Sequence, residues 1–276
     1  MSIRTDLAAE AVGGGPLPGA TVRTGERRGV PVTEVTLDRE AAARLGRAPG
    51  RYLTLETDPL GETALLSSAP AAVLAEALTS LLPSEGLILV ACLGNARVTP
   101  DALGPRTAAG ILATRHIAGQ EGVFRRFRPV AVLTPGVLGQ TGIEAAALVQ
   151  AAVLALSPAA VLVVDALAAE SFSRLGRTVQ LSGCGLAPGG GVGNRRAALD
   201  RESLGVPVAS LGIPTVMDCR ALFEPLGREA PPEVAGALLT PGDIDLLADR
   251  GAALLAHAIN RALQPGLTPE EILALH

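Results

Sequence analysis

Aromatic residues and lysine are what this sequence has least of. Aromatic side chains make up 2% of the 276 residues, whereas hydrophobic residues make up 48%. The core must therefore consist mainly of closely packed Ala, Val, Leu and Ile side chains. All 23 basic residues are arginine. Together with the abundant Ala, Gly and Pro, this is typical of a codon bias, to which we assign no functional meaning.

Excess positive charge and membrane-type segments are also missing. The net charge of −4 argues against a non-specific nucleic-acid binder, so we expect no direct contact with nucleic acid. Residues 1–30 contain no apolar core of the signal-peptide type. The most apolar stretch, residues 145–164, is interrupted by Gln150 and Pro158, which favours a helix followed by a buried strand over a membrane span. We therefore expect a cytoplasmic protein without a membrane partner.

Cysteine is scarce as well, and its spacing excludes the common cysteine frameworks. The three cysteines, Cys92, Cys184 and Cys219, are far apart and form no CxxC pair. Their odd number and wide spacing indicate thiols in a reducing, cytoplasmic setting.

Apolar strand-like runs alternate with helical segments along the chain, which predicts a single α/β domain over residues 1–276. Such an alternation is typical of a mostly parallel sheet with helices on both faces. Residues 1–28 are predicted to be a mobile arm or an irregular cover. The expected strands are 30–37, 51–56, 86–93, 129–133, 160–165 and 178–182, with apolar pieces near the sheet edge at 207–211 and 214–217, and the expected helices are 69–82, 107–117, 142–156 and 241–263.

Two aspartates lie in nearly identical settings, each after an apolar strand-like run and each followed by Ala-Leu. Asp101 comes behind the 86–93 strand, and Asp165 ends the 160–165 strand. The carboxyl ends of parallel strands lie at one edge of a sheet, where the functional crevice forms. A buried carboxylate costs solvation energy unless it is paired or used. We therefore expect Asp101 and Asp165 to share one site.

Three interpretations of this pair are open on the residues alone. Two carboxyl groups brought close together cannot both ionise easily, so one keeps a proton. The ionised group could then take a proton from water while the protonated group polarises a carbonyl, which suits peptide hydrolysis without a metal. The same pair could instead bind a divalent cation. Alternatively, each aspartate only caps the helix that follows it.

A glycine-rich segment, Gly183–Arg196, lies behind the 178–182 strand. It lacks the Gly-Lys-Ser/Thr ending of a phosphate-binding loop. We expect instead that its glycines allow positive φ angles and a close approach of the backbone to a substrate chain or a neighbouring subunit. Asn194 and Arg195 could anchor acidic groups there, and a plain surface turn is the structural alternative.

Four polar residues are candidates for the rim of the cleft, namely Asn95, His116, Asn194 and Arg195. His116 could act as a base, but a structural or rim role fits better because no paired serine or cysteine signature accompanies it. The sequence contains no HExxH, GxSxG or Cys–His signature, and its histidines lack metal-ligand spacing. The prediction is therefore a site without a cofactor or a resident metal.

Further segments of distinctive sequence occur in order along nearly the whole chain. They are Ile3–Ala8, Cys92–Pro105, Thr114–His116, Pro135–Glu144, Val164–Ala169, Pro188–Arg195, Leu204–Val208, Gly212–Asp218 and Leu239–Asp245. No single segment would suffice, but together they resemble the germination (spore) endopeptidase family, the atypical aspartic peptidases of spore-forming bacteria.

The resemblance implies a function and a mechanism. Family members degrade the small acid-soluble proteins that coat spore DNA, and they are homotetramers with an α/β fold similar to hydrogenase maturation peptidases. The two catalytic aspartates of the family fall on Asp101 and Asp165. The expected location is the interior of the forespore or spore, and the expected partners are the acid-soluble proteins and further copies of the chain.

The resemblance also implies zymogen control. Family members lose a short N-terminal propeptide by self-cleavage, and here the junction falls at Asp6-Leu7, leaving residues 1–6 as the propeptide. So short a propeptide could block the cleft if Ile3 or Leu7 packs into it. Two other readings are kept beside the aspartic endopeptidase. One is a metal-assisted peptidase in which Asp101, Asp165 and His116 hold a cation, and the other is a non-catalytic divergent member that binds such a protein without cutting it.

Overall fold

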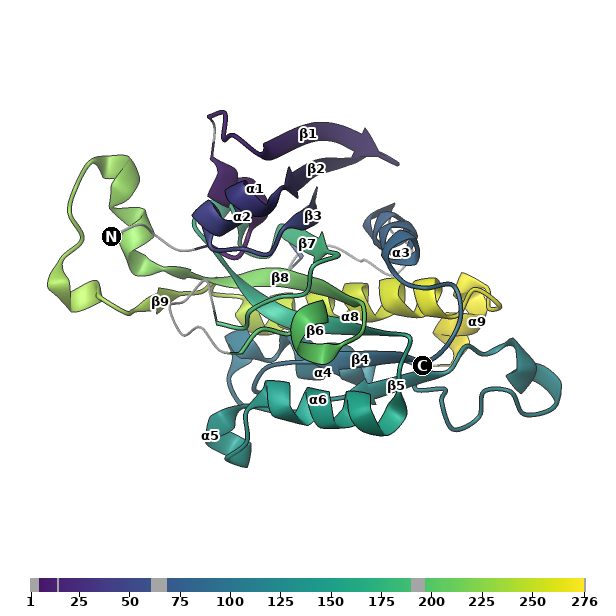
Figure 1. Cartoon of the computed structure of the whole chain (residues 1–276). Helices are drawn as coiled ribbons and strands as arrows, with labels where there is room; N and C mark the ends of the chain where they lie inside the picture. The colour runs from purple at the N-terminus through teal and green to yellow at the C-terminus, as the bar shows by residue number, and fades with distance from the viewer. Residues whose placement is uncertain (1–4, 14, 61–68, 190–196, 276) are drawn as a thin grey trace.

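A nine-stranded sheet forms the centre of the molecule (Figure 1). The computed structural model of the chain describes residues 5–13, 15–60, 69–189 and 197–275. The strand order is β1-β2-β3-β7-β8-β6-β4-β5, and β9 pairs with β8. The strands are β1 (Ala20–Arg27), β2 (Val30–Leu37), β3 (Gly50–Glu56), β4 (Ile88–Cys92), β5 (Val130–Leu133), β6 (Ala160–Ala169), β7 (Thr178–Ser182), β8 (Val208–Asp218) and β9 (Leu238–Leu239).

The sheet is mixed. Strands β8, β6, β4 and β5 run parallel to one another, whereas all pairs among β1, β2, β3, β7, β8 and β9 are antiparallel. The predicted α/β sheet is thus confirmed, but its parallel part is limited to four strands. The N-terminal strands are antiparallel because a tight turn at Arg28-Gly29, with φ angles of 51° and 79°, joins β1 directly to β2.

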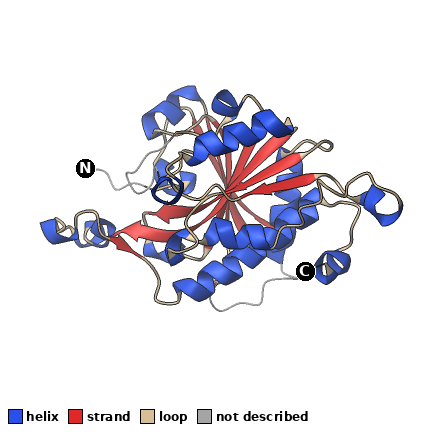
Figure 2. Ribbon diagram, turned by 90° about the horizontal axis from the view of Figure 1, so that it is seen from below, coloured by secondary structure: helices blue, strands red, loops and turns tan. Residues whose placement is uncertain are grey.

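Helices cover both faces of the sheet, as the view from below shows (Figure 2). Helices α3, α4 and α8 pack on one face, while α1, α2, α6 and α7 pack on the other. In the described ranges no helix is both long and apolar enough to cross a bilayer. The helices are α1 (Ala8–Val12), α2 (Arg39–Leu45), α3 (Ala69–Leu81), α4 (Leu103–Ala109), α5 (Leu138–Thr141), α6 (Ala145–Leu156), α7 (Arg201–Leu204), α8 (Ile244–Leu263) and α9 (Pro269–Ala274). Short 3-10 helices are η1 (Thr99–Asp101), η2 (Gly122–Arg126), η3 (Phe172–Arg174), η5 (Cys219–Leu222), η6 (Glu224–Leu226) and η7 (Pro232–Val234).

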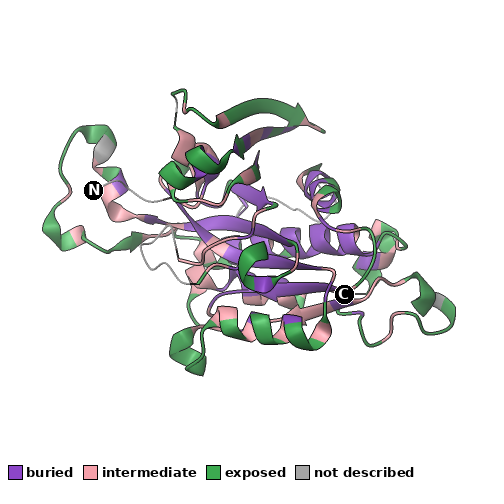
Figure 3. Cartoon of the chain, in the orientation of Figure 1, coloured by how far each residue is buried: buried purple, intermediate pink, exposed green. Residues whose placement is uncertain are grey.

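Side chains along β6 alternate between two apolar cores, and the central strands are buried throughout (Figure 3). Leu162 and Val164 belong to the core under α3 and α8, whereas Val161 and Val163 belong to the core under α6. Because successive residues of a strand point to opposite faces, Asp165 continues the second series and points to the α6 face.

The described part of residues 5–28 is more regular than the sequence indicated. The prediction was an arm or an irregular cover, but residues 8–12 form α1 and residues 20–27 form β1. Side chains of β1 are exposed over most of its length, so the strand has no apolar alternation to reveal it. Its hydrogen bonds to β2 hold it in place instead.

Two other boundaries differ from the prediction. The apolar pieces at 207–211 and 214–217 are one strand, β8, which lies between β7 and β6 rather than near the sheet edge. Pro214 is tolerated there because a bulge shifts the register against β6 at Leu167/Ala168. The helix expected over 107–117 forms earlier, as α4, and ends at Gly110.

Two glycines let the segment that carries Asp101 lie close against the end of β4. A Cβ atom added to Gly104 would overlap the main-chain carbonyl oxygen of Leu93. A Cβ atom on Gly94, which has a φ angle of 116°, would overlap the carbonyl oxygen of Asp101. Larger residues would therefore push η1 and α4 away from the sheet.

We expect Gly104→Ala to lower the free energy of unfolding by about 3 kcal/mol, because the new methyl group has no space against the backbone of Leu93. Urea denaturation monitored by circular dichroism would measure the change. Gly25→Ala is the matched control, since a Cβ atom at Gly25 would meet nothing within 4 Å. Equal stabilities of the two variants would contradict this account of the close approach.

Candidate functional site

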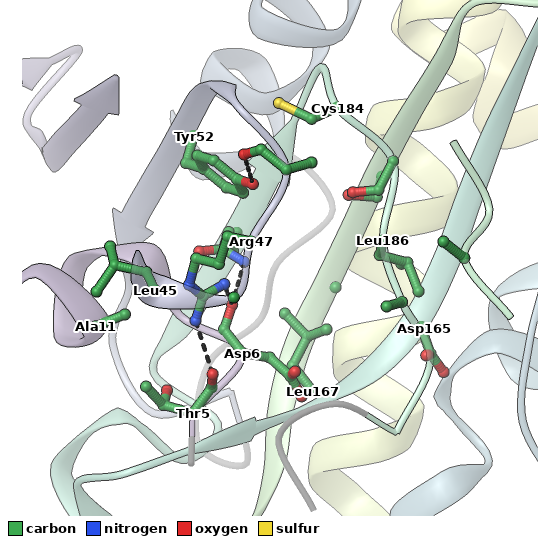
Figure 4. A pocket seen from close by; sticks show the side chains of 18 of the residues that line it. Thr5, Asp6, Ala11, Leu45, Arg47, Tyr52, Asp165, Leu167, Cys184 and Leu186 are labelled. Carbon is green, nitrogen blue, oxygen red and sulfur yellow. Dashed lines mark hydrogen bonds between the residues drawn. The ribbon is translucent and has the colours of Figure 1, made fainter. Parts of the chain in front are cut away.

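A cleft of about 980 Å³ opens on the face of the sheet that carries α1, α2, α6 and α7. Its floor is the middle of strands β7, β8 and β6, and its walls come from the N-terminal segment, the α2–β3 connection and the loop after β7 (Figure 4). The lining residues used below are Thr5, Asp6, Arg47, Tyr52, Asp165 and Gln180.

Strand register brings three of the floor positions into one row. Gln180 of β7 pairs with Gly212 of β8, and Gly212 pairs in turn with Asp165 of β6. Adjacent strands lie about 4.8 Å apart, so Gln180 and Asp165 are two strand spacings from each other on the same face. A Cβ atom on Gly212 would overlap the carbonyl oxygen of Asp165 and the side chain of Leu167, so the missing side chain gives Leu167 its place on the floor of the cleft.

Asp165 is a buried carboxylate at the centre of this fold. Its side chain is on a residue that is 7% exposed, and Oδ1 accepts a hydrogen bond of 2.9 Å from the amide of Ala166. In the close view Asp165 lies across the cleft from Arg47 and Tyr52 (Figure 4). The sequence prediction that Asp165 comes at a strand end is only partly right, because β6 continues to Ala169.

Asp101 lies in η1, just beyond the carboxyl end of β4, and does not line the cleft. Its carbonyl oxygen accepts a 3.0 Å hydrogen bond from the amide of Asn95. The hydroxyl of Thr215, the bulge residue of β8, donates a 2.7 Å bond to the carbonyl of Pro100. These contacts hold η1 against β6 and β8.

The end of β4 connects the two aspartates. The amide of Leu93 donates a 2.8 Å bond to the carbonyl of Val164, the residue before Asp165. The next residue, Gly94, is so close to η1 that a Cβ atom on it would lie 3.3 Å from Oδ1 of Asp101. Asp101 and Asp165 therefore flank the same stretch of backbone, Leu93-Gly94, at the carboxyl edge of the parallel strands.

The residues predicted to form the rim of the cleft lie in different places. The side chain of Asn95 accepts a hydrogen bond from Gln140 of α5, which joins the segments after β4 and β5 at the carboxyl edge. His116 is exposed and lies next to Arg115, whose amide bonds Val130 at the start of β5. The structure thus brings His116 to the opposite edge from Asp101. Asn194 and Arg195 fall outside the described residues.

The N-terminal segment runs along the end of β6. The amide of Asp6 donates to the carbonyl of Ala168, and the amide of Ala168 donates to Oδ2 of Asp6, both at 2.8 Å. Leu7 is fully buried among apolar residues that include Leu167. Thr5 and Asp6 line the cleft directly, whereas Ile3 falls outside the described residues.

Two residues that sequence reasoning missed hold this segment. Arg47 donates from Nη1 to the carbonyl of Asp6 at 2.9 Å and from Nη2 to the carbonyl of Thr5 at 2.7 Å. Gln180 donates from Nε2 to the same Asp6 carbonyl and accepts from the amide of Ala8, both at 2.7 Å. Arg47 is one of 23 arginines, and nothing in its sequence setting distinguishes it. Gln180 could have been noticed as a long polar side chain in a buried strand.

Burial controls the electrostatics around this segment. Desolvation lowers the pKa of Arg47, and the opposing influences of Tyr52, Asp6 and Glu10 raise it. Burial also raises the pKa of Tyr52, whose hydroxyl donates to the carbonyl of Ala48 at 2.6 Å. For Cys92, burial raises the pKa to about 12, so its thiol is not a nucleophile.

Metal-binding groups do not gather in the part of the chain that the structure describes. No set of three His, Cys, Asp or Glu side chains there lies close enough together to hold an ion. Within these residues, Asp101 and Asp165 contribute carboxyl groups that can exchange protons or bind hydrogen-bond donors.

The chain is similar to known proteins over most of its length. The family model described as germination protease matches residues 15–225. The germination protease of Caldanaerobacter subterraneus subsp. tengcongensis is 37% identical over 99% of this chain and 97% of its own. That of Clostridium tetani is 34% identical over 99% and 98%.

Among solved structures, a NiFe hydrogenase maturation protease from Thermococcus kodakarensis is similar at 17% identity, with a TM-score of 0.39 over 66% of this chain and 98% of that one. The extent of the family match and the identity to its members over nearly the whole length decide the assignment. The chain belongs to the germination protease family.

Proposed function

We propose that this chain is the endopeptidase that initiates degradation of small acid-soluble DNA-binding proteins during spore germination. Membership of the germination protease family makes it a peptidase of germination. The substrate, the location in the cytoplasm of the forespore or spore core, and the catalytic residues are our proposal. A single observation carries the mechanism: Asp101 and Asp165 flank the same two residues, Leu93-Gly94, at the carboxyl edge of the sheet.

In the proposed mechanism the aspartates work as one unit. One carboxylate takes a proton from water, and the oxygen of that water attacks the carbonyl carbon of the peptide bond. The other carboxyl group, protonated, donates a hydrogen bond to the carbonyl oxygen and then supplies a proton to the leaving amine. We assign the two roles to the pair and not to either residue, because coupled carboxyl groups titrate together.

We further propose that the chain is a zymogen that cuts itself between Asp6 and Leu7. The segment that contains this bond already lies along the cleft, where Thr5 and Asp6 are among the lining residues. Hydrogen bonds hold the main chain on both sides of this bond, from Arg47 to Asp6 and from Ala8 to Gln180. The segment therefore stays in the cleft, where it occupies space that a substrate chain would need.

Replacing either aspartate should abolish cleavage. We expect Asp101→Asn and Asp165→Asn each to lower kcat by at least about a thousandfold, because neither role can be filled without a carboxyl group. Loss of residues 1–6, followed by mass spectrometry, and cleavage of a purified acid-soluble spore protein would both be measured. Unchanged circular dichroism and melting temperature would show that each variant is folded.

Asp249→Asn is the matched control, because Asp249 is an exposed aspartate that pairs with Arg106 on the surface. It should retain activity close to that of the unmodified chain. Cleavage by both site variants at the normal rate would contradict the proposed mechanism. Intact substrate after long incubation with the unmodified chain would support a binding protein that does not cut.

Removal of metal should leave cleavage unchanged. Among the described residues, no third His, Cys, Asp or Glu side chain joins the aspartates as a metal ligand, and a divalent cation needs several oxygen ligands. The rate would be compared before and after treatment with a chelator, with the metal content measured by mass spectrometry. Loss of activity that one divalent cation restores would replace the aspartic mechanism with the metal-assisted one.

We propose that the protein is a homotetramer. The segment from η5 to β9 projects from the end of β8, away from the helices that cover the sheet (Figure 1, Figure 2). Leu226 is 66% exposed there, and Leu222 and Leu238 are exposed beside it. Exposed apolar side chains gathered on one projection are typical of a protein interface.

Leu226→Asp should therefore reduce the assembly to smaller species, because it places a charge on this apolar surface. Light scattering after gel filtration would give the mass. Leu154→Asp is the control, since Leu154 of α6 is 78% exposed on another part of the surface. A tetramer in both variants would exclude the projection as an essential contact, and a monomer for the unmodified chain would refute the tetramer.

A further inference from the structure

The guanidinium group of Arg47 is held in the cleft by hydrogen bonds to neutral acceptors, while the carboxylates of Asp6 and Glu10 lie near enough to raise its pKa. Its two terminal nitrogens donate to the main-chain carbonyls of Thr5 and Asp6. Its third nitrogen, Nε, is buried without an acceptor among the described residues. Desolvation lowers the pKa of this group, so its positive charge is costly to keep where it is. A stronger anionic acceptor at the same position would stabilise it.

Gln180 reaches the same carbonyl oxygen from the sheet. Its Nε2 lies 2.7 Å from the oxygen of Asp6, and Arg47 Nη1 lies 2.9 Å from it. Two donors, one of them charged, therefore converge on a single oxygen atom. The peptide bond that this oxygen belongs to is the bond between Asp6 and Leu7.

Hydrolysis of this bond would change the chemistry of that oxygen. Water adds its oxygen to the carbonyl carbon of Asp6, the C–N bond breaks, and the nitrogen of Leu7 takes a proton. At neutral pH the products are a carboxylate on Asp6 and an ammonium group on Leu7. The neutral acceptor between Arg47 and Gln180 thus becomes an anionic one. The bond from Gln180 changes from one between two neutral groups to a charge-assisted one, which is roughly twice as strong, and the bond from Arg47 becomes an ion pair between guanidinium and carboxylate.

We infer that Arg47 and Gln180 form a binding site for the C-terminal carboxylate of a cleaved peptide, and that its first ligand is the fragment that ends at Asp6. The inference rests on the proposed self-cleavage at Asp6-Leu7. Its consequence is that cutting alone does not clear the cleft. The fragment stays bound by its new carboxylate until it dissociates, so that release of the fragment, and not hydrolysis, sets the moment of activation.

Binding can be tested without any cutting. The protein is the full chain with Leu7→Asp, which puts a charge among the apolar contacts of Leu7 and so releases the segment, together with Asp101→Asn to prevent cleavage. Hydrogen exchange would verify the release. The probes are two fluorescein-labelled peptides of residues 1–6, one with a free C-terminal carboxylate and one with a C-terminal amide, and fluorescence anisotropy gives their Kd.

We expect the carboxylate peptide to bind at least about tenfold more tightly than the amide peptide. Adding Arg47→Met should remove this difference, and Gln180→Glu should reverse it, because a carboxylate at position 180 repels the ligand. Arg39→Met is the matched control, since Arg39 is an exposed arginine at the start of α2, the helix that precedes Arg47. Equal Kd values for the two peptides, or no binding of either, would overturn the inference.

Retention of the cleaved fragment is then measured on the unmodified chain and on the two arginine variants. After self-cleavage, the fragment should co-elute with the protein in gel filtration, whereas it should be lost from Arg47→Met and kept by Arg39→Met. Immediate loss of the fragment from the unmodified chain would also overturn the inference. A chain that never cuts at Asp6-Leu7 would refute the proposed self-processing instead, and the peptide measurement would still decide whether the carboxylate site exists.

Discussion

The hydrogen bonds of Gln180 to the two sides of Leu7 are the constraint on which the site depends. Strand β7 lies in the middle of the sheet, and a long polar side chain there needs partners for both its oxygen and its nitrogen. The main chain of residues 6 and 8 supplies them at 2.7 Å each. Removing the N-terminal segment would leave the side chains of Gln180 and Arg47 without these hydrogen-bond partners. The segment therefore stabilises the cleft that it occupies.

Two glycines allow close packing around the site. Gly212 leaves room for the side chain of Leu167 on the floor of the cleft, and Gly104 lets α4 approach the backbone at the end of β4. Leu, Val and Ala fill the two cores on either side, so close packing limits any shift of these strands. The positions of Asp101 and Asp165 are therefore set by backbone contacts, which a side-chain pattern does not reveal.

The sequence predicted the parts of the fold that burial determines. Apolar runs located β4, β6 and β7, which are central strands with buried side chains on both faces, and also β5, the half-buried strand at the edge of the sheet. The sequence did not predict strands whose position depends on strand pairing or on a bulge and not on burial. These are the exposed strand β1 and the part of β8 around Pro214. Asp165 followed from its place behind an apolar run. Arg47 and the location of His116 did not, because they depend on contacts between segments far apart in the chain.

The site has two parts with different roles in the proposed reaction. In one part, at the carboxyl edge of the parallel strands, Asp165 and its neighbour Asp101 offer carboxyl groups, of which only that of Asp165 lines the cleft. In the other part, Arg47 and Gln180 hold the main chain of the N-terminal segment, and their hydrogen bonds become stronger when the acceptor carries negative charge. A site that binds the product of its own reaction more tightly than the uncut chain delays its opening. Under the proposed self-processing, such a delay would postpone the cutting of other proteins until the fragment has dissociated.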